Sequence, residues 1–213
     1  MTCASSVWPK ELPVEIVEKI IPPSHGVMFG LLSKKRTEYI HYKLPAQITV
    51  KRSGLLQALE SGIENMQKWA DIKTLDLSND SGDGDQAMIK FKEIKKLTPV
   101  LGQCTSLVDL NLFGNRITYE GMYELAKVLG QFPSLTRLNL GRNRIEFPGM
   151  NVLAGVLPQC PSLAHLDLDG NRIARFGAQA LAGVLGQCPS LAHLDLGRND
   201  IGAEGMERLA GVL

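Results

Sequence analysis

Ten residues occur twice in this chain in identical form, and the spacing of the two copies constrains what the chain can fold into. The segment QCPSLAHLDL spans residues 159–168 and again 187–196, an offset of 28 residues. The same spacing continues upstream, where related segments begin at Leu107 and Leu135. Self-similarity at a fixed period is typical of proteins that stack one structural unit many times. The chain is therefore expected to form a solenoid in which each unit packs against its neighbours.

One template, L-x-x-L-x-L-x-x-N-x-I, is repeated four times in succession, beginning at residues 107, 135, 163 and 191. An earlier copy begins at Ile72 and is 35 residues long, because seven residues are inserted around SNDSGDGDQAMIKFKE. This template resembles the leucine-rich repeat, and its long form, with GM..LA.VL after the asparagine, resembles the ribonuclease-inhibitor type. The resemblance covers residues 72–213.

Each unit is predicted to contain one short strand and one helix. The alternating leucines of L-x-L point to one face of a strand, and Met122, Leu125 and Leu129 follow the asparagine at helical spacing. Stacked units bury both apolar faces in one continuous core. A helix is wider than a strand, so the stack must curve with its strands inside. The expected fold is an α/β, right-handed leucine-rich-repeat solenoid, with a curved parallel sheet inside, helices outside and an N-terminal helical cap.

Two positions in the unit carry recurring residues with a predicted structural role. An asparagine side chain has both a donor and an acceptor, so four asparagines are expected to tie down buried loop backbone: Asn115, Asn143, Asn171 and Asn199. Another position holds Phe132 in one unit and a cysteine in three others. A position that accepts either residue is predicted to be buried and apolar, with free thiols in a reducing compartment: Cys104, Cys160 and Cys188.

The chain divides into an N-terminal segment, residues 1–44, and a solenoid, residues 45–213. The solenoid starts with irregular repeats over 45–106, including a weak strand near Ile48 and Val50. Regular repeats follow, the last of them truncated: 107–134, 135–162, 163–190 and 191–213. Because the final helical pattern continues to the last residue, we expect a longer natural chain, or cover from a partner or by self-association.

The N-terminal segment has two interpretations. LPVEIVEKII (12–21) opens with Leu-Pro-x-Glu-Ile, and LLSKKRTEYI (31–40) follows, so the segment resembles an F-box. F-box modules bind the adaptor of a cullin-type ubiquitin ligase, and the resemblance implies that role for four residues: Leu12, Pro13, Ile16 and Ile20. The alternative is a helical cap that shields the first repeat.

The residues that flank the buried leucines of each strand are predicted to line the concave side in lanes. The first lane comprises Asp109, Arg137, His165 and His193. The second lane comprises Asn111, Asn139, Asp167 and Asp195. Four further residues follow the strands: Phe113, Arg142, Asp169 and Arg198. A solenoid offers such side chains on a rigid frame, so these twelve are predicted to bind a protein partner.

Two adjacent histidines and two aspartates in these lanes form a two-by-two patch, for which zinc binding is conceivable. The preferred interpretation is that duplication copied His-Leu-Asp without any metal. The sequence lacks the P-loop, nucleophile-elbow, HExxH and CxxC motifs, so we predict neither an enzyme nor a cofactor.

The net charge of +1 argues against a nucleic-acid or anionic-membrane partner held by bulk charge. No stretch reaches the roughly 18 apolar residues of a membrane span, and the first residues lack the apolar run of a signal peptide. We therefore expect a cytoplasmic or nuclear protein.

Three functions of different class fit the sequence. The first is a non-enzymatic interaction scaffold, and the second is a ubiquitin-ligase substrate receptor that uses the F-box-like segment. The third is a small-GTPase regulator, because the repeat also resembles that of Ran GTPase-activating proteins, although the acidic tail of that family is absent.

Overall fold

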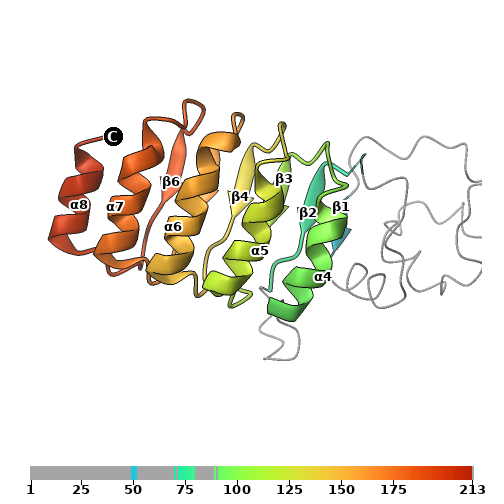
Figure 1. Ribbon diagram of the computed structural model, residues 1–213, viewed down its shortest axis with the longest axis horizontal. Helices are drawn as coiled ribbons and strands as arrows, with labels where there is room; N and C mark the ends of the chain where they lie inside the picture. The colour runs from blue at the N-terminus through green and yellow to red at the C-terminus, as the bar shows by residue number, and fades with distance from the viewer. Residues whose placement is uncertain (1–48, 52–69, 71, 80–88, 90, 213) are drawn as a thin grey trace, which may run out of the picture.

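A single parallel sheet runs through the part of the chain that the computed structural model describes, residues 49–51, 70, 72–79, 89 and 91–212 (Figure 1). Its strands are paired in chain order. They are β1 (Thr49–Lys51), β2 (Thr74–Asp76), β3 (Asp109–Asn111), β4 (Arg137–Asn139), β5 (His165–Asp167) and β6 (His193–Asp195). Val50 pairs with Leu75, so a strand is confirmed at Val50, whereas Ile48 and the whole segment 1–44 lie outside the described residues.

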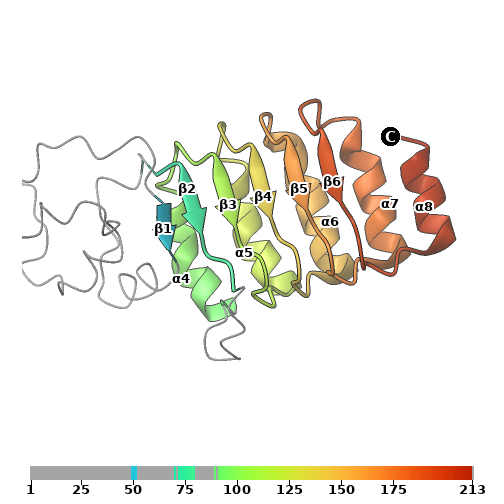
Figure 2. The ribbon, with the colours of Figure 1, turned by 180° about the vertical axis from the view of Figure 1, so that it is seen from behind.

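One helix follows each strand from β2 onward, and all of these helices lie on the same side of the sheet (Figures 1 and 2). They are α4 (Phe91–Leu101), α5 (Tyr119–Leu129), α6 (Glu146–Val156), α7 (Ala174–Leu185) and α8 (Gly202–Ala210), with a short 3₁₀ turn, η5 (Leu157–Gln159), after α6. The alternation of strand and helix confirms the α/β solenoid. We call its two sides the strand face, shown in Figure 2, and the helix face, shown in Figure 1.

The core lies between the sheet and the helices. In each of β3 to β5 the central leucine is at most 2% exposed, while both flanking residues point away from the core and are more accessible. Met122, Leu125 and Leu129 bury the inner face of α5, as their helical spacing predicts. Cys104, Phe132 and Cys160 are buried in this core, which confirms the predicted apolar position in three units, whereas Cys188 in the last unit is only partly buried.

The insertion predicted in the first repeat is located by two backbone contacts. The amide of Asn79 pairs with the next loop in the same way as that of Gly114 does 35 residues later. The amide of Ile89 donates to the ladder asparagine ahead of it at 3.0 Å, as that of Ile117 does 28 residues later at 2.8 Å. The seven extra residues therefore lie between Asn79 and Ile89.

The four asparagines form the expected ladder, and each one binds the loop backbone of two units. The amide nitrogen of Asn143 donates to the carbonyls of Leu112 (3.0 Å) and Leu140 (2.8 Å). Its oxygen accepts the backbone amides of Asn115 (3.0 Å) and Ile117 (2.8 Å). Because every unit repeats this pattern, the loops are held at a fixed spacing behind the strands.

A second ladder, which we did not predict, joins the loops that precede the strands. The hydroxyl of Ser162 donates to the carbonyl of Pro133 at 2.7 Å, and that of Ser190 donates to Pro161 at 2.6 Å. The Pro-Ser pair within each duplicated segment thus fastens a unit to the one before it.

The last unit is less covered than the others. Leu191, Leu194 and Leu196 are partly exposed, although the matching leucines of the preceding unit are at most 3% exposed. On α8, Met206 is 54% exposed. The apolar side chains of the last unit are therefore more accessible than those of the unit before it.

Candidate binding surface on the strand face

The two predicted lanes lie side by side on the strand face, where they line a hollow of about 590 Å³. Strand pairing places Asp109 beside Arg137, and His165 beside His193, in the first lane. The same register places Asn111 beside Asn139, and Asp167 beside Asp195, in the second lane. β2 extends the lanes with Thr74 and Asp76. The 28-residue spacing of the repeats therefore predicted correctly which residues lie side by side in each lane.

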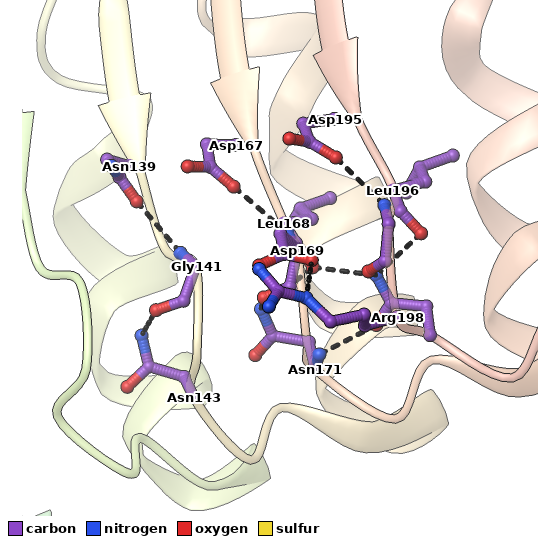
Figure 3. A network of polar contacts seen from close by, with 12 residues as sticks. Asn139, Gly141, Asn143, Asp167, Leu168, Asp169, Asn171, Asp195, Leu196 and Arg198 are labelled. Carbon is purple, nitrogen blue, oxygen red and sulfur yellow. Dashed lines mark hydrogen bonds and ion pairs between the residues drawn. The ribbon is translucent and has the colours of Figure 1, made fainter.

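Second-lane side chains also have a structural task that the sequence analysis missed. In each unit, the Oδ1 atom of this Asp or Asn accepts the backbone amide two residues ahead, at 2.8–3.1 Å (Figure 3). Such local bonds by Asp and Asn stabilise turns, and here they end the strand and direct the chain into the loop. This structural role could have been predicted, because every unit has an Asp or Asn two residues before the turn amide.

Asp167 and Asp195 each use only one oxygen in this way. Among the described residues, no hydrogen bond or ion pair reaches the Oδ2 atom of either carboxylate. Burial raises the pKa of Asp167, and the charges of Asp195 and Asp169 raise it further. The charge of Arg198, which is paired with Asp169, lowers the pKa of Asp167, so the negative charge of the two carboxylates on the strand face is only partly compensated.

The histidines of the patch meet ring to ring. The imidazoles of His165 and His193 stack with their centroids 4.4 Å apart and their planes within 8° of parallel. Both side chains are exposed. Across the residues with described placement, no three His, Cys, Asp or Glu groups are arranged to hold one metal ion.

The four residues that follow the strands form two contacts between neighbouring units. The guanidinium of Arg142 lies 5.3 Å from the centre of the Phe113 ring. Arg198 makes a two-pronged ion pair with Asp169, in which Nε donates to Oδ1 at 2.7 Å and Nη2 donates to Oδ2 (Figure 3). Each arginine thus reaches back to the preceding unit.

This arrangement corrects one predicted binding residue. Asp169 is only 6% exposed, because Arg198 covers it, so its carboxylate is not open to a partner as the sequence analysis expected. The same hydrogen bond to Arg198 lowers the pKa of Asp169. Asp169 is therefore a contact between units.

Glycines make room for both contacts. A Cβ at Gly141 would lie 3.0 Å from the Phe113 ring, and one at Gly197 would lie 2.9 Å from the Asp169 carboxylate. The backbone of Arg142 and Arg198 is left-handed, at φ 50° and 51°. This conformation is unfavourable for a residue that has a side chain. In the alternate units glycine occupies that position.

The helix face carries an exposed aromatic row that the sequence analysis did not identify. Tyr119, Tyr123, Phe147 and Phe176 are 46–59% exposed on α5, α6 and α7. The rings of Phe147 and Phe176 are 6.0 Å apart and border a hollow of about 620 Å³ between α6 and α7. This row could have been predicted, because these aromatic residues occupy helix positions that face away from the apolar stripe.

The thiols are poor candidates for chemistry. Burial raises the pKa of Cys104 to about 12 and that of Cys160 to about 11, so at neutral pH neither is the thiolate that reacts.

Within the described portion of the chain, no helix has the length and apolar character needed to span a bilayer.

Comparison with known proteins agrees with this geometry. Four segments match the family model described as Leucine Rich repeat, at residues 103–126, 133–154, 159–182 and 187–210. Similar solved structures include one titled "Leiomodin-1 Actin-Binding Site 2 (ABS2)", with a TM-score of 0.52 and 18% sequence identity, over 74% of this chain and 84% of that chain. At this identity the likeness shows a shared fold. No curated protein gives a significant match.

Proposed function

We propose that this chain, four segments of which match the leucine-rich repeat family model, is a non-enzymatic scaffold whose strand face binds a protein partner. The observation that carries the proposal is the hollow lined by both lanes. Extended surfaces with varied side chains on a rigid frame are how solenoids engage partners, and the asparagine ladder supplies that rigidity.

The proposal is tested by capture from cell extract with the tagged full chain and two variants. The strand-face variant carries His165→Lys and His193→Lys, both at exposed first-lane positions. The control carries Gln179→Glu and Glu207→Lys, both exposed on the helix face. A partner identified by mass spectrometry should be retained by the wild type and the control and lost by the strand-face variant. Retention by all three would contradict the proposal.

Two defined proteins belong in the same experiment. The structural relative is named for an actin-binding site, so purified actin is one candidate. The adaptor of a cullin-type ligase is the other candidate, because the F-box resemblance predicts that Leu12, Pro13, Ile16 and Ile20 bind it. These four residues lie outside the described residues, so their role is still a prediction. Binding of a small GTPase instead would favour the third function.

A further inference from the structure

The two lanes of the strand face are acidic. From β2 to β6 they contain four aspartates and one arginine. That arginine, Arg137, lies 3.9 Å from Asp109, so its charge is already partly matched. The remaining negative charge is concentrated at β5 and β6, where Asp167 and Asp195 are register partners. A partner of complementary charge would therefore bind at this end of the surface.

The carboxylates there are prepared for a cation with several donors. Their Oδ1 atoms are fixed by the turn amides at 2.9 and 2.8 Å, which holds each carboxylate in one orientation. Their Oδ2 atoms have no partner among the described residues. Neighbouring parallel strands are about 4.8 Å apart, so one planar guanidinium can donate to both oxygens.

The stacked imidazoles stand next to these carboxylates, two residues earlier on the same strands and on the same face. Because the two rings stack on each other, they present their edges beside the carboxylates. The planar, weakly hydrated fork of a guanidinium fits two oriented carboxylates at such a site better than a compact, strongly hydrated ammonium does. The two identical His-Leu-Asp segments thus combine an imidazole pair with two oriented anions.

We propose that the His-Leu-Asp segments of β5 and β6, residues 165–167 and 193–195, receive an arginine side chain from the protein partner. This proposal rests on the proposed function and specifies the chemistry of its partner. The guanidinium donates to the free oxygens of Asp167 and Asp195 and lies against the imidazoles, while Asp169 takes no part because Arg198 occupies it.

The test uses three labelled peptides of one glycine-serine sequence, which carry two arginines, two lysines or two glutamates. Fluorescence anisotropy with the full chain should give the order arginine, lysine, glutamate from strongest to weakest, and the arginine affinity should fall as salt rises. NMR should place the arginine-induced shifts of amide signals at residues 165–167 and 193–195. Equal affinities for arginine and glutamate peptides, or no saturable binding at millimolar peptide, would overturn the proposal.

A matched pair of variants separates local recognition from bulk charge. Asp167→Asn with Asp195→Asn should weaken arginine-peptide binding about five- to tenfold, and it keeps the turn-forming Oδ1 atoms. Glu146→Gln with Glu207→Gln removes the same two charges from exposed helix-face positions and should change affinity less than about twofold. Equal losses in both variants would refute the site. If the partner is lost by the strand-face variant above but the arginine peptide shows no preference, the binding face stands and only the arginine is wrong.

Discussion

At the scale of single residues, α7 offers a matched pair of glycines that separates close packing from helix propensity. A Cβ at Gly177 would lie 2.4 Å from Cγ2 of Ile173 and 3.1 Å from Cβ of Met150, whereas nothing lies within 4 Å at Gly183. We expect Gly177→Ala to lower the free energy of unfolding by about 1–3 kcal/mol through overpacking, and Gly183→Ala to raise it by up to about 1 kcal/mol. Denaturant unfolding followed by circular dichroism measures both, and changes of the same sign would contradict the packing argument.

Asp167 offers a residue-scale prediction that depends on pH. Because its pKa is raised in the folded chain, first by burial and then by Asp195 and Asp169, its negative charge destabilises the fold at neutral pH. Asp167→Asn keeps the turn acceptor, as Asn139 does for Gly141 at 2.9 Å, so we expect a gain of up to about 1 kcal/mol. The gain should be full above the raised pKa and should shrink as pH falls through it, in thermal unfolding scanned across pH. A gain that is unchanged in acid would contradict this cause.

At the scale of elements, the two arginines that join neighbouring units should differ in importance. Arg198→Gly removes the cost of left-handed backbone, which is about 1–2 kcal/mol. It also leaves the carboxylate of Asp169, which is only 6% exposed, without its ion-pair partner. Because the Arg198 side chain is itself 66% exposed, solvent screens this ion pair, and we expect Arg198→Gly to be less stable than Arg142→Gly. Arg142→Gly relieves left-handed backbone in the same way and loses only the contact with the Phe113 ring, worth about 0.5–1 kcal/mol, so it should be neutral to stabilising.

The difference between these variants carries its own control. Arg198 lowers the pKa of Asp169, so the stability that the pair contributes is present above the pKa of an unfolded aspartate and is lost as pH falls through the lowered value. Thermal unfolding of Arg198→Gly and Arg142→Gly should therefore converge in acid. A gap that stays constant down to that pH would mean that the ion pair is not its source.

Elements also show what the sequence could and could not reveal. The L-x-L pattern and the helical spacing predicted the strands and helices, since both follow from periodicity along the chain. The position of the lanes followed from the 28-residue register. The contacts of Arg142 and Arg198 could not be predicted, because they depend on left-handed backbone and on glycines in the neighbouring unit. Burial of Asp169 was missed for the same reason.

At the scale of the whole molecule, the effect of losing one asparagine from the ladder should depend on which unit that asparagine belongs to. Contacts in a solenoid run only between neighbouring units, so a defect in the middle divides the stack, while a defect near an end shortens it. Asn143 belongs to the second of the four regular units and Asn199 to the fourth. The same substitution at these two positions therefore tests whether the described units unfold as one body.

We expect Asn143→Ala to lower the free energy of unfolding by more than about 3 kcal/mol, because it leaves the buried amides of Asn115 and Ile117 without their acceptor, and each such loss costs about 1–3 kcal/mol. Hydrogen exchange should then show lost amide protection on both sides of the break, in units 107–134 and 135–162. Asn199→Ala removes the acceptor of Asn171 and Ile173, so its loss of protection should be confined to residues 163–212. Uniform loss across all four units in both variants would show that the solenoid opens as a single cooperative body, and that the ladder does not divide it.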